Sequence, residues 1–128
     1  MTYYIENDYL VAGIKSAGAE LTSIKSKESD FEFLWQGNPD IWYGQSPVLF
    51  PIIGRVLDDK YYLEGKEYTM PKHGLFRKRE TQVVSQGKDK ITFVESKVTF
   101  YDNKLESCNL FQLFLTKKDA IYFFILFD

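Results

Sequence analysis

The chain has 128 residues, of which 45% are hydrophobic and 27% are charged, and its formal net charge is −2. This length fits a single domain, and this balance of apolar and charged residues excludes an intrinsically disordered chain. No stripe of clustered lysines and arginines is present, so we expect no nucleic-acid binding. Aromatic residues make up 17% of the chain, which favours strands over helices.

The first third of the chain predicts two hairpins. In YYIENDYLVAGIK, the polar stretch Glu6–Asp8 separates two β-prone runs, which is a hairpin signal. In ELTSIKSKESDFEFLW, apolar residues lead into a polar turn over 25–30. Phe31, Phe33 and Trp35 then alternate with other residues, with the period of two expected of a half-buried strand.

The middle of the chain predicts a loop, a short apolar strand and a tight hairpin. Glycines and prolines over 37–47 are typical of a loop. The run VLFPII is short enough for a strand in which Pro51 would lie at an edge or a bulge. In DKYYLEGKEYTM, the pair Glu64–Gly65 predicts a tight turn between two strands.

The last third predicts four more strands. RETQVVSQGKDKITFVESKVTFYD contains two strands around a turn at 86–89. NLFQLFLT and AIYFFILF follow, separated by a turn at 117–119. Turn signals therefore recur about every 8 to 12 residues, as in an antiparallel sandwich or barrel. The predicted fold class is all-β, an antiparallel β-sandwich.

The C-terminal run AIYFFILF predicts either a buried strand or an apolar end that other chains can cover. A membrane span needs about 20 apolar residues, so this run is too short and we expect no membrane segment. The stretch IYFFILF contains no charge, proline or glycine, which is the signature of an aggregation-prone segment. We therefore expect self-association through this apolar C-terminus.

Motifs for cofactor or metal chemistry are missing from the sequence. It has no Gly-rich phosphate loop, no cluster of cysteines and histidines, and no Gly-x-Ser-x-Gly elbow. We expect no cofactor and no bound metal. The single cysteine, Cys108, cannot form an intramolecular disulfide, and the N-terminus shows no signal peptide. Both features favour a cytoplasmic location.

Arg55 and His73 bracket the predicted hairpin and are the candidate site residues. Taken alone, Arg55 would pair with Asp58 or Asp59, and His73 would be an exposed loop residue. A hairpin brings its two ends together, so the two side chains can instead converge on one patch. Arginine supplies fixed cationic donors, and histidine donates or accepts near neutral pH. With aromatic side chains such as Trp35 nearby, this pair suits a polyhydroxyl ligand such as a sugar.

Four motifs follow one another over residues 34–77: Leu-Trp-x-Gly, Pro-x-Leu-Phe-Pro-x-x-Gly-Arg, Tyr-x-x-x-Gly-Lys-x-Tyr and Pro-x-His-Gly-x-x-Arg. Their identity and order resemble those of the aldose 1-epimerases (galactose mutarotases). The resemblance covers residues 1–94. It implies the N-terminal portion of a galactose mutarotase-like β-supersandwich, with residues 1–128 as a single, incomplete domain.

The resemblance also implies a reaction and roles for residues. Mutarotases interconvert the α and β anomers of aldohexoses without a cofactor or metal. A base takes the proton of the anomeric hydroxyl, an acid protonates the ring oxygen, and the ring opens and closes on its other face. Matched by motif, Arg55 and His73 are the arginine and first histidine that hold sugar oxygens and stabilise charge. Arg77 and Trp35 are further sugar-binding candidates.

The chain departs from the family pattern in its proton-transfer groups. The family's second histidine (the acid), its sugar-binding aspartate and its glutamate base belong to the later half, before which this sequence ends. The resemblance therefore implies a truncated and catalytically incomplete mutarotase. Two alternatives stay open. One is a non-catalytic carbohydrate-binding β-domain. The other is a relative of hexose-6-phosphate epimerases, in which Lys72, Arg77 and Lys78 would meet a phosphate, although the arginine-glycine stretch expected before VLFP is missing.

Overall fold

The structure is a computed structural model that describes residues 1–95 and the strand backbones of 109–115 and 121–127. Nearly all regular structure in these residues is β-strand, accompanied by two short 3₁₀ turns, η1 (Leu57–Asp59) and η2 (Phe76–Lys78). The predicted all-β class is confirmed. No helical segment in the described part of the chain is long and apolar enough to cross a membrane.

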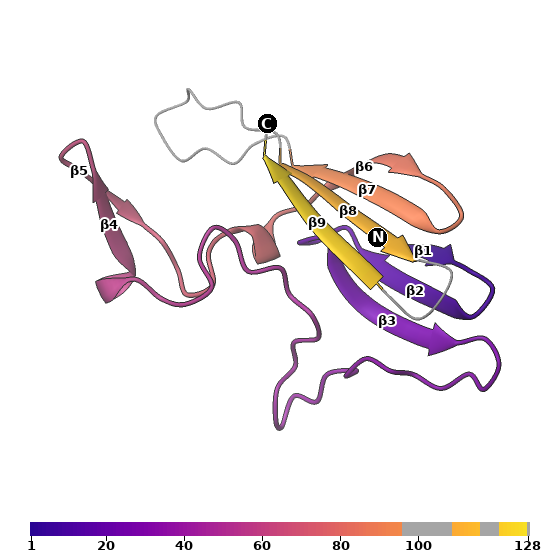
Figure 1. The fold of residues 1–128 in the computed structure, drawn as a ribbon. Helices are drawn as coiled ribbons and strands as arrows, with labels where there is room; N and C mark the ends of the chain where they lie inside the picture. The colour runs from indigo at the N-terminus through magenta and orange to yellow at the C-terminus, as the bar shows by residue number, and fades with distance from the viewer. Residues whose placement is uncertain (96–108, 116–120, 128) are drawn as a thin grey trace.

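The strands form three antiparallel sheets, which can be followed in Figure 1. The first sheet has the order β1 (Thr2–Glu6), β2 (Leu10–Lys15), β3 (Glu20–Ser26); the second is the hairpin of β4 (Lys60–Leu63) and β5 (Lys66–Thr69); the third has the order β6 (Gln82–Gln86), β7 (Lys90–Glu95), β8 (Asn109–Leu115), β9 (Ile121–Phe127). The predicted turn at 117–119, between β8 and β9, lies outside the described residues.

Local turn chemistry forms the predicted hairpins. After β1, the side-chain Oδ1 of Asn7 accepts the backbone N–H groups of Tyr9 at 2.8 Å and Leu10 at 2.7 Å, which closes the turn into β2. Between β4 and β5, Glu64 and Gly65 have positive φ angles of 50° and 78°. A two-residue hairpin turn of type I′ requires positive φ at both positions. β6 and β7 also pair as predicted.

The three-stranded and four-stranded sheets share one apolar core. Its buried members are Ile5, Ala12, Ile14, Ala19, Val48, Phe76, Ile91 and Phe93. The edge of the Tyr3 ring meets Phe93 across the sheets, with the ring centroids 5.7 Å apart. Phe76 is only 1% exposed, and burying a phenylalanine side chain contributes about 1.5–3 kcal/mol. The core therefore holds in place the segment that follows the candidate residue His73.

The strand predicted over 31–35 is wrong in its orientation and extent. Only an isolated bridge between Lys25 and Glu32 forms there. The three aromatic side chains are exposed: Phe31 by 61%, Phe33 by 60% and Trp35 by 43%. Between them, the Glu32 carboxylate accepts the Ser23 hydroxyl at 2.5 Å and the Ile24 N–H at 2.8 Å. Because the carboxylate takes the inward position, the alternating aromatic side chains face outward.

The strand predicted at VLFPII is also wrong. In this run, Phe50 alone forms a bridge, which is parallel and pairs with Gly74. Pro51 has no N–H to donate, so the ladder does not continue past Phe50. Val48 enters the core, whereas Ile53 is 76% exposed. The run is thus an irregular connection that reaches from the core to the surface.

Candidate functional site

The two flanks of the β4–β5 hairpin lie side by side, as its strand pairing requires. At the base of the hairpin, the backbone N–H of Met70 donates to the carbonyl of Asp59 at 2.7 Å. Farther from the hairpin, the N–H of His73 donates to the carbonyl of Gly54 at 2.8 Å. Gly54 directly precedes Arg55 in the sequence. The backbone therefore places His73 beside the segment that carries Arg55.

Close backbone approach explains why a glycine follows His73. Gly74 has a φ of 74°, and a Cβ atom on it would lie 2.1 Å from the carbonyl oxygen of Phe50. Only glycine fits there, because both the left-handed conformation and the missing side chain are needed. The next N–H, of Leu75, donates to the same Phe50 carbonyl at 2.9 Å. The His-Gly pair is thus where the returning chain meets the 50–55 segment.

Arg55 forms a two-pronged ion pair with Asp59, one of the two partners expected for it. Its Nε and Nη2 atoms lie 2.6 Å from the two carboxylate oxygens. Hydrogen bonding to the guanidinium lowers the pKa of Asp59 below its usual value, and the same contact raises the pKa of Arg55. A guanidinium has five N–H donors, so the edge that carries Nη1 stays available to another acceptor.

The contact of the His73 ring with the backbone fixes the tautomer of the neutral imidazole. Nδ1 lies against the backbone carbonyl of Ile53. A carbonyl oxygen only accepts hydrogen bonds, so Nδ1 carries the proton of the neutral ring and Nε2 becomes the acceptor. The two flanks of the hairpin thus carry a cationic donor on Arg55 and an imidazole acceptor on His73. A sugar hydroxyl both donates and accepts, so it can bond to either group.

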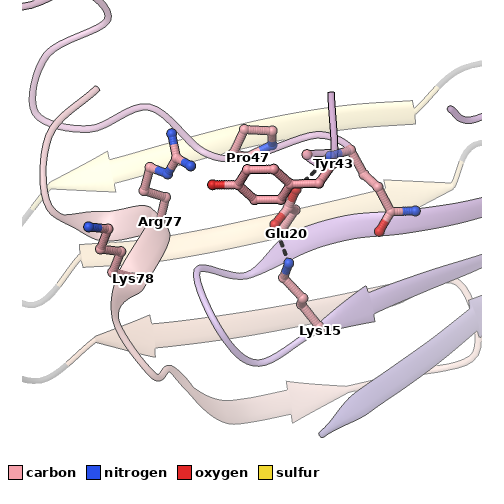
Figure 2. Close-up of a pocket in the computed structure, with 8 residues that line it drawn as sticks. Lys15, Glu20, Tyr43, Pro47, Arg77 and Lys78 are labelled. Carbon is pink, nitrogen blue, oxygen red and sulfur yellow. Dashed lines mark hydrogen bonds and ion pairs between the residues drawn. The ribbon is translucent and has the colours of Figure 1, made fainter. Parts of the chain in front are cut away.

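The other two candidates, Trp35 and Arg77, lie in different surroundings. The Trp35 indole N–H donates to the carbonyl of Trp42 at 3.0 Å, within the 31–47 segment. Arg77 lines a pocket with Lys15 and Glu20 (Figure 2). Among the described residues, no hydrogen bond or ion pair joins Trp35 or Arg77 to Arg55 or His73. The contacts therefore place the backbone of His73 beside the residue that precedes Arg55, and they place Trp35 and Arg77 in other surroundings.

The pocket that contains Arg77 has a volume of about 240 Å³ and is called here the Arg77 pocket. Its walls come from the end of β2, the start of β3, the 43–47 loop and η2. The lining residues are Lys15, Glu20, Tyr43, Gly44, Gln45, Pro47, Arg77 and Lys78. Figure 2 shows the Tyr43 ring lying across the pocket, with Glu20 and Lys15 on one side of it.

Packing between two turns builds the Arg77 pocket. Gly18, in the turn between β2 and β3, has a φ of 67°, and a Cβ atom on it would lie 2.8 Å from the Arg77 carbonyl oxygen. Its N–H donates to the Arg79 carbonyl at 2.6 Å. This contact seats the turn directly on η2, so Lys15 and Glu20, which flank the turn, stand beside Arg77.

Glu20 connects two walls of the pocket, the Lys15 side chain and the 43–47 loop. It is only 6% exposed, and its Oε2 forms an ion pair with Lys15. Its Oε1 accepts the backbone N–H groups of Gln45 at 3.2 Å and Ser46 at 3.0 Å. The sequence did not reveal Lys15 or Glu20 as pocket residues, because contacts distant in sequence join them to Arg77. The turn glycine Gly18 was the one local signal, and by itself it indicates only a turn.

The arrangement of the strands and the comparisons with known proteins define the same class, a galactose mutarotase-like β-sandwich. The galactose mutarotase related enzyme of Lactobacillus acidophilus superposes with a TM-score of 0.82 at 36% sequence identity. A galactose mutarotase-like protein of Lactobacillus casei superposes with a TM-score of 0.81 at 30% identity. Residues 1–107 match the aldose 1-epimerase family. The chain belongs to this family.

The relatives are considerably longer than this chain. The plasmid-encoded protein LacX of Lactococcus lactis subsp. lactis is 36% identical over 111 residues, which are 82% of this chain and 37% of LacX. The Lactobacillus acidophilus and Lactobacillus casei structures each match 91% of this chain, and the match covers 39% and 40% of their own chains. The chain therefore spans about two fifths of the length of these relatives.

Proposed function

We propose that the chain binds aldohexoses through Arg55 and His73, as the arginine–histidine part of an aldose 1-epimerase sugar site. One observation supports this proposal: the backbone N–H of His73 donates to the carbonyl of Gly54, the residue that precedes Arg55. The available edge of the guanidinium donates to sugar oxygens, and Nε2 of the imidazole accepts from a hydroxyl. Charge-assisted hydrogen bonds of this kind are among the stronger ones that a protein makes.

In the proposed reaction, these two residues hold the sugar and stabilise charge. Ring opening needs a base at the anomeric hydroxyl and an acid at the ring oxygen. Arg55 is permanently cationic and cannot accept a proton. The sequence contains one histidine, so it cannot supply both a sugar-holding and an acid histidine. We therefore assign binding of the sugar, and not the proton transfers, to these 128 residues.

Equilibrium dialysis with radiolabelled galactose tests the proposal. Arg55→Ala should weaken binding about tenfold or more, since hydrogen bonds to charged groups contribute about 1.5–3 kcal/mol. Arg55→Lys should lose most of the affinity as well, because an ammonium cannot form the two-pronged pair with Asp59 and keep an oriented donor edge. His73→Ala should weaken binding to a smaller extent.

Lys88→Ala is the matched control, because it removes an exposed positive charge on the β6–β7 hairpin. The Lys88 side chain is 65% exposed, and its Nζ lies 3.9 Å from Oδ1 of Asp8. It should leave galactose binding unchanged. Equal affinity in the wild type, Arg55→Ala and His73→Ala would show that the sugar does not bind here.

A further inference from the structure

The Arg77 pocket carries a charge imbalance that the proposed sugar site does not use. The lining residues include three cations, Lys15, Arg77 and Lys78, but a single carboxylate, that of Glu20. Three cations against one anion leave two positive charges around a cavity of about 240 Å³. This volume is several times that of a water molecule, which occupies about 30 Å³ in the liquid. The pocket is therefore large enough for a small anionic group.

Among the described residues, the lining cations without a side-chain partner are Arg77 and Lys78. Lys15 is engaged in its ion pair with Glu20. In the described part of the chain, the side chains of Arg77 and Lys78 make no hydrogen bond or ion pair. Arg77 is nevertheless half-buried. A guanidinium that is partly removed from water is more stable when its N–H groups have an acceptor. Figure 2 shows the Tyr43 hydroxyl on the side of the pocket where Arg77 and Lys78 stand. Three kinds of donor therefore border the same space.

We propose that the Arg77 pocket binds the phosphate group of a small molecule. A phosphate monoester carries about −1.5 to −2 charges at pH 7 and three acceptor oxygens, which matches two net positive charges and three separate donors. The planar fork of Arg77 can bind two phosphate oxygens at once. The Lys78 ammonium and the Tyr43 hydroxyl approach from other directions, which suits a tetrahedral group better than a planar carboxylate.

Glu20 is compatible with a bound phosphate because its own charge is already satisfied. Both of its oxygens are occupied, one by Lys15 and the other by the backbone N–H groups of Gln45 and Ser46. It thus holds the loop wall against β3. Because a change at Glu20 would disturb that wall, the test uses Arg77 and Lys78. This proposal does not depend on sugar binding at Arg55 and His73.

Equilibrium dialysis of the 128-residue chain with radiolabelled inorganic phosphate tests the proposal directly. Arg77→Met and Lys78→Met each keep an apolar stem and remove one charge, and each should weaken binding about tenfold or more. Lys88→Met removes an equal charge outside the pocket and should change nothing. Thermal unfolding of each variant checks the fold, and Lys78→Met is the safer variant because this side chain is exposed.

Competition identifies the ligand chemistry. Glycerol 3-phosphate should displace the label and glycerol should not, while acetate should compete much less well than phosphate. Competition by glycerol 3-phosphate should weaken from pH 7 to pH 5, because a phosphate monoester loses its second charge with a pKa of about 6. Arg55→Ala should leave phosphate binding intact, which separates this site from the sugar site. The proposal is wrong if phosphate does not bind, if neither Met variant weakens it, or if acetate competes equally well.

Discussion

At the scale of single residues, the ion pair between Arg55 and Asp59 orients the proposed sugar-binding donor. Both side chains are on the surface, yet the two contacts of 2.6 Å fix the plane of the guanidinium. An arginine side chain that becomes immobilised only when ligand binds loses up to about 2 kcal/mol of conformational entropy. Asp59 immobilises the Arg55 side chain before the sugar binds, which reduces the entropy lost on binding. We therefore regard Asp59 as a positioning residue.

The first prediction follows from this role. Asp59→Asn keeps a residue type that tolerates the positive φ of 55° at this position but removes one of the two bonds to Arg55. It should weaken galactose binding severalfold in equilibrium dialysis. Asp58→Asn is the control, because its φ of 53° is similar and Asp58 forms no hydrogen bond with Arg55. If Asp59→Asn binds galactose more tightly, Asp59 competes with the sugar and does not position Arg55.

The second prediction concerns Glu95, a buried carboxylate in β7. Burial raises its pKa, and Arg79, with its Nε 3.8 Å from Oε1, offsets this only in part. Its Oε2 is buried without a hydrogen-bond partner among the described residues. Because the pKa of Glu95 is raised in the folded state, the protonated side chain contributes to stability below the ordinary pKa of 4.5. This contribution is lost as the pH rises through the folded-state pKa.

Glu95→Gln should therefore raise the free energy of unfolding at pH 7 and have little effect at pH 4. Chemical denaturation at the two pH values measures both differences. Glu80→Gln, at an exposed position, is the control and should be neutral at both. A loss of stability in Glu95→Gln at pH 7 would mean that the ionised carboxylate is favourable in the folded chain.

At the scale of elements, Glu32 decides how the aromatic segment lies on β3. Burial tends to raise its pKa, but hydrogen bonds from the Ser23 hydroxyl and the N–H groups of Ile24 and Leu34 outweigh burial, and the pKa is lowered. Because the pKa of Glu32 is lowered in the folded state, the ionised carboxylate contributes to stability above the ordinary pKa of 4.5. This contribution is lost as the pH falls through the folded-state pKa.

The third prediction is that Glu32→Gln lowers the free energy of unfolding by about 1 kcal/mol at pH 7, the typical contribution of a hydrogen bond. The difference should shrink as the pH falls and the wild-type carboxylate becomes protonated. Glu28→Gln, in the exposed turn before this segment, should have no effect at either pH. An equal loss in Glu32→Gln at pH 7 and pH 3 would assign the contribution to side-chain shape and not to charge.

The elements predicted correctly are those that local chemistry specifies. Asn7 closes one hairpin and Glu64–Gly65 the other, so sequence pattern suffices for both. The sequence pattern at 31–35 indicates that successive side chains point to opposite faces, but it does not indicate which face is buried. The hydrogen bonds of Glu32 decided that, and they involve β3. The local hairpin also explains why the meeting of its two flanks, at Gly54 and His73, follows from sequence. The Arg77 pocket, by contrast, depends on the distant contact with Gly18.

At the scale of the whole molecule, the four-stranded sheet ends in β9, which is an edge strand in the described topology. An apolar edge strand readily pairs with other chains. Apolar side chains are also exposed in the 41–57 region, including Ile41 by 76% and Leu57 by 84%. Both features favour association of the chain when it is expressed alone.

The fourth prediction is therefore that the 128-residue chain forms dimers or larger assemblies, and that deleting residues 120–128 improves its solubility. Size-exclusion chromatography with light scattering on both proteins measures this. A monodisperse full-length monomer at tens of micromolar would show that the edge is covered within the chain.

The fifth prediction is that the chain does not accelerate anomer interconversion. General acid–base catalysis contributes about 10²–10⁴-fold per positioned group, and the sequence offers no second histidine. Fresh α-galactose followed by polarimetry should relax at the rate of the buffer. A clearly faster relaxation that slows in His73→Ala would show that proton transfer occurs within these residues.

The most direct test of the sugar-binding site uses the single histidine of the chain. Because His73 is the only histidine, the ring signals in a histidine-edited NMR spectrum belong to it without further assignment. Titration with galactose should shift these signals along a saturable curve, and the shift should be greatly reduced in Arg55→Ala but retained in Arg77→Met. Galactose binding that leaves the His73 ring signals unmoved would contradict the account.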